Sequence, residues 1–394
     1  MITLEVGGRR YNNFTEVSIE RALDAISGVF YFQAASDYKL PFPIPRGQAV
    51  KVYVNDTQVI TGYVDRIKVS YDSNTHTISI EGRDKTADIV DSKVDHKIEF
   101  VAPISLEEIA TQTLAAIGAT DVSVINNVEG LEPFKKGDLI SANIGQSAFD
   151  FLDMYAKKKQ VITTTDGLGN LVFSRASTVS TDIQLNNIVG GTLNTIKSAS
   201  VSYDDSERFN EYTFYSQGNP GGDKDVGESS KQLTDRTGTY TDPEVRTSRQ
   251  YHEVSESSSK EATLDDRAKW EGQIRKAKSF RYNCTVVGHS PVDSGEAYIP
   301  NTLVRVKDDF ADVNDELLLF KVTSRVSSSG GSTTDLEMLT KEAFNVLLAQ
   351  KARELAKKDT KSNSKNEKQT IDKTKFTDYD NTARDFFYDD FKKR

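Results

Sequence analysis

The chain has 394 residues, a single cysteine (Cys284) and a formal net charge of −9. Its length allows two to four domains with hydrophobic cores, and the lone cysteine excludes an intrachain disulfide, so stability must come from packing or assembly. The acidic balance argues against a specific nucleic-acid-binding surface, which needs clustered Lys and Arg, and suits a conduit that nucleic acid passes without sticking.

No segment is typical of a membrane span or of a signal peptide. The longest apolar runs, such as Leu317 to Phe320, fall far short of the roughly 20 residues that a spanning helix needs. The first six residues read as a short strand before Gly7 and Gly8, with no basic flank preceding an apolar core. We therefore expect a protein without a membrane span that is made and folded in a cytoplasm.

Residues 1–95 show the alternation and turn residues of a β domain. From Val50 to Asp84 the runs VKVYVND, VITGYVDRIKVSY and HTISIEGRD predict a three-stranded antiparallel meander. Pro41, Pro43 and Pro45 predict a stiff edge or loop, because each proline removes a ladder donor.

Residues 96–180 change to a helical period and predict an α/β insertion. Ser105 and Glu108 form a capping box before an amphipathic helix that ends at Gly118. A second helix begins at Ser147, and the strands QVITTT and NLVFSR then flank a glycine-bearing turn, so a hairpin follows this helix.

Residues 181–345 predict a second β domain with a loop and helix insertion over 216–278. The segment 216–261 is polar and glycine-rich, which favours a long loop, and a helix is expected over 263–278 with Trp270, Ile274 and Ala277 on one face. From Leu303 to Leu339 the runs LVRVKDD, LLLFKVTSRVSSS and TTDLEML repeat the strand and turn pattern of the first domain. One chain therefore holds two copies of a similar β module.

Residues 346–394 predict a helix followed by an extended C-terminal tail. The stretch after Lys351 is basic and polar, and the final segment alternates aromatic residues with aspartates. Exposed apolar clusters usually mark docking surfaces, so we expect this tail to bind a partner; the alternative is that it folds back on its own domain. The predicted partner-binding residues are Phe376, Tyr379, Phe386, Phe387, Tyr388 and Phe391.

Motifs for catalysis, cofactors or metals are incomplete. His252-Glu253 lacks the second histidine of a zinc-protease helix, and Gly167-Leu168-Gly169 lacks the third glycine of a dinucleotide loop. The segment from Asp72 begins like a calcium loop but carries Arg83 where a bidentate Glu is required. We expect no catalytic, cofactor-binding or metal-ligating residues, and hence no enzyme activity.

The run GQSAFDFLDMYAKKKQVITTTDGLGNLVFSRAS, from Gly145 to Ser177, resembles a segment of the baseplate hub proteins of contractile phage tails, in particular the Mu-like tail protein and late control protein D family. The two meanders, CTVVGHSP and SGEAYIPNTLVRVKDD agree with that family in order over about residues 1–345. The base of type VI secretion spikes is similar. The tail after Lys351 does not match the family pattern.

This resemblance implies an α+β, mainly β fold with two similar antiparallel β-barrel-like tube domains, an α/β insertion and a C-terminal helical and extended tail. It implies a homotrimer that joins the hexameric tail tube to the trimeric central spike and forms part of the channel, as a structural component of the virion baseplate. Other baseplate proteins and the tape measure protein are further candidate partners. Two alternatives stay open: a tail-associated cell-wall-degrading protein, and an adhesin that binds host polysaccharide.

Overall fold

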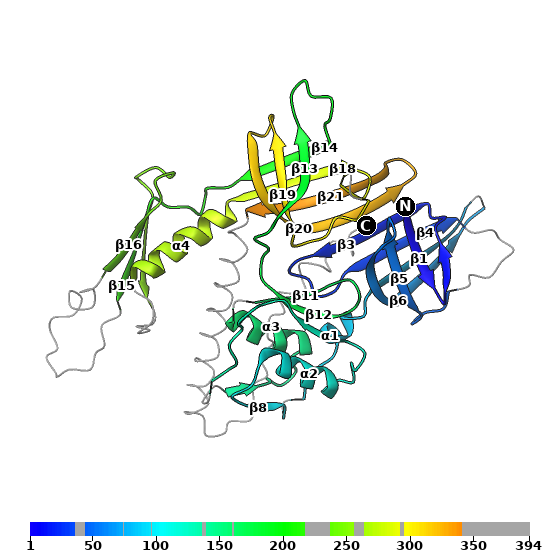
Figure 1. The fold of residues 1–394 in the computed structure, drawn as a ribbon, viewed down its shortest axis with the longest axis horizontal. Helices are drawn as coiled ribbons and strands as arrows, with labels where there is room; N and C mark the ends of the chain where they lie inside the picture. The colour runs from blue at the N-terminus through cyan, green and yellow to red at the C-terminus, as the bar shows by residue number, and fades with distance from the viewer. Residues whose placement is uncertain are drawn as a thin grey trace. The chain divides into compact units, whose positions relative to one another are not determined.

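The computed structural model describes residues 1–35, 44–73, 75–95, 97–135, 139–159, 161–216, 237–255, 264–291 and 295–340. The fold of this part is α+β and mainly β, as the sequence predicts (Figure 1). None of its helices is both long and apolar enough to cross a membrane. Pro41, Pro43, the predicted helix after Phe344 and the whole aromatic tail lie outside the described residues.

The first β domain contains a five-stranded antiparallel unit, which we call module 1. In space its strands follow the order β3-β4-β7-β6-β5, so the last three form the predicted meander. Two more strands, β1 and β2, continue the sheet beyond β5. The bounds are β1 (Ile2–Val6), β2 (Arg9–Tyr11), β3 (Glu16–Ala22), β4 (Val29–Ala35), β5 (Ala49–Val54), β6 (Thr57–Tyr71) and β7 (His76–Asp84).

The second β domain contains a unit with the same strand order, which we call module 2. Its strands run β14-β18-β21-β20-β19, again with antiparallel pairing throughout, and β13 adds to β19 in parallel. The second meander is thereby confirmed. The bounds are β13 (Ser180–Asn187), β14 (Ile196–Tyr203), β18 (Phe280–Val287), β19 (Leu303–Asp308), β20 (Val313–Ser327) and β21 (Gly331–Thr340).

The two modules correspond strand by strand. Each has a 15-residue strand, β6 or β20, whose first half pairs with the preceding strand and whose second half pairs with the following one. Both strands carry an irregularity at the same point of the ladder, between Val64 and Arg66 in β6 and between Leu319 and Lys321 in β20. This repeat makes Arg66 the equivalent of Lys321, and the neighbouring residues of the two strands correspond in the same register.

The modules join edge to edge in a single 13-stranded sheet. β3 of module 1 pairs antiparallel with the second half of β20 of module 2, from Ala22 opposite Lys321 to Glu16 opposite Ser327 (Figure 1). Each module keeps its own apolar cluster: Phe30, Phe32 and the valines of β5 in module 1, and Tyr282, Leu319 and Met338 in module 2.

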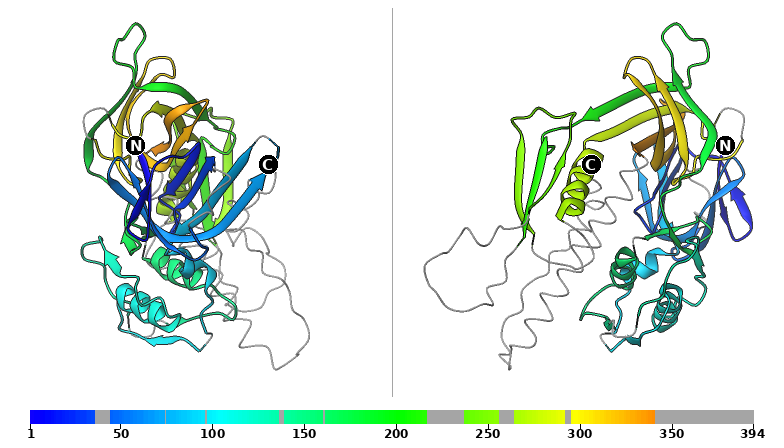
Figure 2. Two further views of the ribbon diagram at one scale, coloured as in Figure 1. Left: turned by 90° about the vertical axis from the view of Figure 1, so that its right-hand side faces the viewer. Right: turned by 60° about the vertical axis from the view of Figure 1, so that its left-hand side comes forward.

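The capping box, the two helices and the hairpin predicted for the segment after β7 are present. Ser105 caps α2 through the backbone N–H of Glu108, whose side chain accepts from the Ser105 N–H in return, and Gly118 has a positive φ of 81° just past the helix. Helices α2 and α3 are in contact (Figure 2), and the predicted hairpin β11-β12 follows α3. The bounds are α1 (Ala87–Asp91), β8 (Glu99–Val101), α2 (Leu106–Ala116), β9 (Val124–Asn126), β10 (Leu139–Ser141), α3 (Ala148–Lys158), β11 (Ile162–Thr165) and β12 (Leu171–Ser174).

A second insertion leaves module 2 between β14 and β18. The interpretation of residues 216–261 as one long loop is wrong in part, because β16 and β17 lie within this segment. They pair with the two edges of β15 to form a three-stranded sheet, and α4 packs against β15 and β16. The predicted helix is present as α4, whereas the side chains of Trp270, Ile274 and Ala277 lie outside the described part. The bounds are β15 (Glu211–Ser216), β16 (Thr237–Thr241), β17 (Gln250–Ser255) and α4 (Leu264–Lys278).

Candidate assembly surfaces

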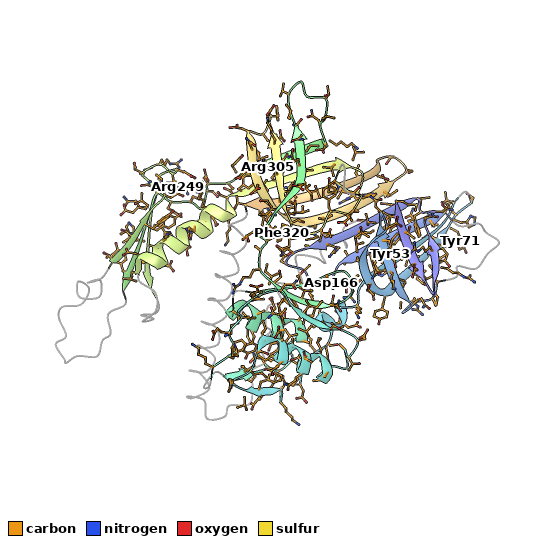
Figure 3. The ribbon with its side chains drawn as sticks, in the orientation of Figure 1. Tyr53, Tyr71, Asp166, Arg249, Arg305 and Phe320 are labelled. Atoms are coloured by element: carbon orange, nitrogen blue, oxygen red, sulfur yellow. The ribbon has the colours of Figure 1, made fainter. Side chains whose placement is uncertain are left out.

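The second half of β6 offers one free sheet edge. β7 pairs with one side of residues 66–71, while on the other side β5 ends its pairing at Tyr63, and no further strand of the described chain follows. Two large apolar side chains stand exposed there, Val69 at 63% and Tyr71 at 78%. Figure 3 shows Tyr71 at the far end of β6, where the hairpin to β7 turns.

The matching half of β20 shows what covers such an edge. In module 2 the equivalent residues of Val69 and Tyr71 are Ser324 and Val326, and β3 pairs with both of them. Ser324 is only 5% exposed as a result. The same element of the repeat is therefore covered in one module and bare in the other.

The outer edge of β14 is the second free edge. β18 pairs with one side of this strand from Ile196 to Tyr203, and β14 stands at the end of the sheet path of the described strands. Most of its residues are exposed, including Tyr203 at 62%, although the ring of Tyr203 packs edge-on against Phe280 with centroids 5.4 Å apart. In module 1 the equivalent strand is β3, which is buried between β4 and β20.

A polar pocket of about 210 Å³ lies where module 1 meets the β11-β12 hairpin. Arg21, Thr165, Asp166 and Asn301 are among its lining residues. Burial lowers the pKa of the Arg21 guanidinium, and the carboxylates of Asp84 and Asp166 oppose that shift. Asp166 itself is held in its turn, where it accepts hydrogen bonds from the backbone N–H groups of Leu168 and Asn170 (Figure 3).

Asp84 fastens the hairpin to module 1. Its carboxylate is 1% exposed and accepts from the Thr86 N–H at 3.1 Å, from the Thr86 hydroxyl at 3.0 Å and from the Thr165 hydroxyl at 3.3 Å. Burial raises the pKa of Asp84 to about 6 against the lowering effect of these hydrogen bonds and of Arg21. Since every partner is a hydroxyl or amide of the fold itself, this arrangement positions the insertion and shows no activated nucleophile.

Several residues considered for catalysis, cofactor binding or metal binding take part in local structure. Gly167 and Gly169 have positive φ angles in the β11-β12 turn, as a hairpin requires, and His252 on β17 lies 3.2 Å from the Tyr215 hydroxyl. Burial raises the pKa of the Cys284 thiol to about 12, so the thiolate is scarce at neutral pH. In the described part of the chain no cluster of three or more His, Cys, Asp or Glu side chains could hold a metal ion.

The two free edges were missed by the sequence reasoning. The predicted docking residues Phe376, Tyr379, Phe386, Phe387, Tyr388 and Phe391 lie outside the described residues, so this prediction stays a prediction. A signal for the β6 edge was present in the alternation of Ile67, Val69 and Tyr71, which continues beyond the point where β5 stops pairing. An alternating apolar face without an intrachain neighbour indicates a surface that assembly covers.

Comparison with known proteins finds similarity to baseplate proteins of phage tails. Residues 1–84 match the family model of the Mu phage baseplate assembly protein GpP-like N-terminal domain, and residues 86–175 match that of the baseplate hub protein gp44-like second domain. The baseplate hub protein gp44 of Escherichia phage Mu is 28% identical over 352 residues, which is 88% of this chain and 89% of gp44.

Solved structures agree with these matches. The 43 kDa tail protein of prophage MuSo2 from Shewanella oneidensis is 29% identical, with a TM-score of 0.71 over 87% of this chain and 99% of that protein. A component of the E. coli type VI secretion system shares the fold at 10% identity, with a TM-score of 0.51 over 86% of this chain and 76% of that one. The two matching domain models and the similarity to gp44 along most of both chains show that this protein is similar to the baseplate hub proteins of phage tails.

Proposed function

We propose that this protein is a homotrimeric structural adaptor that joins the hexameric tail tube to the trimeric central spike and forms part of the channel between them. The observation that supports it most is the repeat of one five-stranded order in modules 1 and 2. Three chains with two equivalent modules each present six similar units, so one face can match a six-fold ring while the chain symmetry stays three-fold.

The two insertions differ between the modules and support the three-fold side of this proposal. In module 1 the turn from β3 to β4 spans only residues 23–28, whereas in module 2 the equivalent connection from β14 to β18 spans residues 204–279 and carries β15, β16, β17 and α4. A ring of six modules would therefore alternate a short turn with a folded insertion. Such alternation provides three equal sites for a three-fold partner such as the spike.

The proposed role is structural rather than catalytic. Two buried charged groups, Asp84 and Arg208, have partners within the fold: Asp84 accepts from the Thr165 hydroxyl, and Arg208 pairs with Asp242 at 2.8 Å and with Glu244 at 2.7 Å. The negative net charge of −9 fits a channel wall that does not retain nucleic acid.

Mass measurement of the purified full-length chain in solution, followed by averaged particle images, tests the adaptor role. We expect a trimer with a pseudo-six-fold ring that binds purified tail tube protein on one side and spike protein on the other. A monodisperse monomer that binds neither would contradict the proposal. Release of peptidoglycan fragments that single carboxylate substitutions abolish would favour the cell-wall-degrading alternative.

The aromatic C-terminal tail is proposed to dock on another baseplate protein. Six aromatic side chains interleaved with aspartates, from Phe376 to Phe391, suit a partner with an apolar groove and basic rim. Deleting residues 376–394 should weaken one assembly contact and leave the trimer mass unchanged. Complete tails assembled at the normal yield by the truncated chain would refute this assignment.

A further inference from the structure

The junction between the two modules of one chain has a counterpart that the chain leaves open. Within the chain, β3 of module 1 covers the second half of β20 of module 2. By the repeat, β14 is the equivalent of β3 and β6 is the equivalent of β20, yet β14 and the second half of β6 face no strand of the described chain. The edges of β14 and of the second half of β6 thus correspond to the two strands that pair in the internal contact between β3 and β20.

We propose that the outer edge of β14 of one subunit pairs antiparallel with residues 66–71 of β6 in a second copy of this chain, in the register that β3 and β20 show within the chain. This inference rests on the proposed trimer and gives its interface. One interface with two unlike halves is heterologous, and it closes into a ring when the rotation between successive subunits permits.

The register follows from the ladders without adjustable choices. Arg66 of β6 pairs with Glu81 of β7, and its equivalent Lys321 of β20 pairs with Glu337 of β21. Glu81 therefore corresponds to Glu337, which aligns β7 with β21. On the next strands, Tyr31 of β4 lies opposite Glu81 and Asn283 of β18 lies opposite Glu337, which aligns β4 with β18. Ser18 then corresponds to Ser200, because these serines lie opposite Tyr31 and Asn283.

Transferring the β3 and β20 pairs gives the contacts between subunits. Ser18 opposite Arg325 becomes Ser200 opposite Ser70, and Ile19 opposite Ser324 becomes Val201 opposite Val69. The other pairs of the internal junction transfer in the same way. Of the β14 residues of one subunit and the residue that follows them, Tyr203 lies opposite Ile67, Ala199 opposite Tyr71 and Asp204 opposite Arg66 of β6 in the next subunit.

These pairs fit chemically, although the register was set by the ladders alone. The three large apolar residues exposed along the two edges, Val69, Tyr71 and Tyr203, fall on the same face of the joined sheet, where each gains an apolar neighbour. At one end, Arg66 meets Asp204. Arg66 is already 2.9 Å from Glu81, and Asp204 adds a second acidic partner. An ion pair also crosses the internal junction, where Lys321 lies 2.8 Å from Glu20, although Glu20 corresponds to Ser202 and not to Asp204.

The geometry suggests a disulfide test between Ser70 and Ser200. Both serines are exposed, and directly opposed residues of an antiparallel pair have Cα atoms about 4.5–5.5 Å apart, which a disulfide can span. The full-length Ser70→Cys, Ser200→Cys double variant is purified, oxidised mildly and separated on a non-reducing gel. Native Cys284 is buried and its thiol pKa is raised, so the parent chain and each single variant serve as controls.

A matched control shifts the register by one residue. In the Ser70→Cys, Val201→Cys variant the two thiols point to opposite faces of the joined sheet, because side chains alternate along a strand. We expect the Ser70→Cys, Ser200→Cys variant to form covalently linked dimers and trimers that a reductant dissolves, with at least tenfold less linkage in the shifted variant and none in the single variants.

The possible failures are distinguishable. A trimer in solution that gives no linkage through Ser70→Cys and Ser200→Cys, or equal linkage in the shifted variant, overturns the register and leaves the proposed adaptor intact. A parent chain that remains monomeric overturns the register and the trimer together. As a second readout, Val69→Glu should weaken trimer formation at least tenfold without changing the monomer's circular dichroism, whereas Lys68→Glu, on the opposite face of the strand, should leave the trimer in place.

Discussion

Ile19 of β3 lies directly opposite Ser324 of β20, although 305 positions in the sequence separate them. Both side chains are buried, Ile19 at 3% exposure and Ser324 at 5%. This pair lies at the centre of the strand contact that fuses the two modules into one sheet. The fold therefore depends on a long-range strand pairing that neither module can make alone.

Replacing Ile19 by alanine should cost about 2–5 kcal/mol of unfolding free energy, because a buried isoleucine loses its transfer free energy and leaves a cavity. Glu20→Gln on the same strand is the control. It removes only the partly exposed ion pair with Lys321, which is worth less than about 1 kcal/mol. Urea unfolding of both variants at pH 7 measures the difference, and equal losses would contradict the role given to this junction.

Asn301 fastens the linker after β12 to module 2. It has a positive φ of 68°, its side-chain oxygen accepts from the Ser177 N–H at 2.7 Å, and its amide donates to the Arg175 carbonyl at 3.0 Å. Asn301→Gly keeps the left-handed backbone but loses these bonds, so we expect a loss of about 1–3 kcal/mol. Limited proteolysis should then cut faster between residues 174 and 180, whereas Ser329→Ala, in the exposed turn between β20 and β21, should not change that rate.

The sequence predicted the local elements well and the assembly surface poorly. Alternation in HTISIEGRD and the capping box at Ser105 act within a few residues, and both elements formed as expected. β16 and β17 were missed because their residues are polar and their stability comes from pairing with β15, which composition does not reveal. The free edge at Val69 could be found only when the pairing of every neighbouring strand was known.

His289 should make stability fall under acidic conditions. It is 3% exposed, its Nδ1 lies 3.1 Å from the Thr334 hydroxyl, and burial, together with the positive amino group of Met1, lowers its pKa to about 4. The unfolded chain takes up the proton near pH 6.5, so the neutral folded form is favoured above that pH. This contribution is lost as the pH falls from about 6.5 to 4, by roughly 3 kcal/mol in total.

The variant His289→Asn tests this effect, because an asparagine side chain can still donate to Thr334 but does not titrate. Urea midpoints of parent and variant are compared at pH 7 and at pH 4.5. On acidification the stability of the variant should rise relative to that of the parent, because only the parent loses the His289 contribution. An identical change in stability in both chains would show that His289 does not contribute.

Asp84 should act in the opposite direction over nearly the same range. Its folded pKa of about 6 lies above the usual value of 3.8, so its contribution is fully present below about pH 4 and is lost as the pH rises through 6. At pH 7 the buried carboxylate then costs roughly 3 kcal/mol relative to its protonated form. Because His289 gains stability over the interval in which Asp84 loses it, the parent chain should show a nearly flat profile between pH 4 and 6.5.

Replacing either residue should therefore reveal the pH dependence of stability that the other one causes. In Asp84→Asn the amide oxygen can still accept from Thr86, and the variant should become more stable as the pH rises from 4 to 6.5, because the contribution of His289 is no longer opposed by that of Asp84. In His289→Asn the same rise in pH should lower stability. In the double variant the free energy of unfolding should again be nearly independent of pH over this interval. Urea titrations of the parent, the two single variants and the double variant therefore distinguish two opposed buried groups from a fold whose stability does not depend on pH. Parallel profiles in all four chains would contradict both assignments.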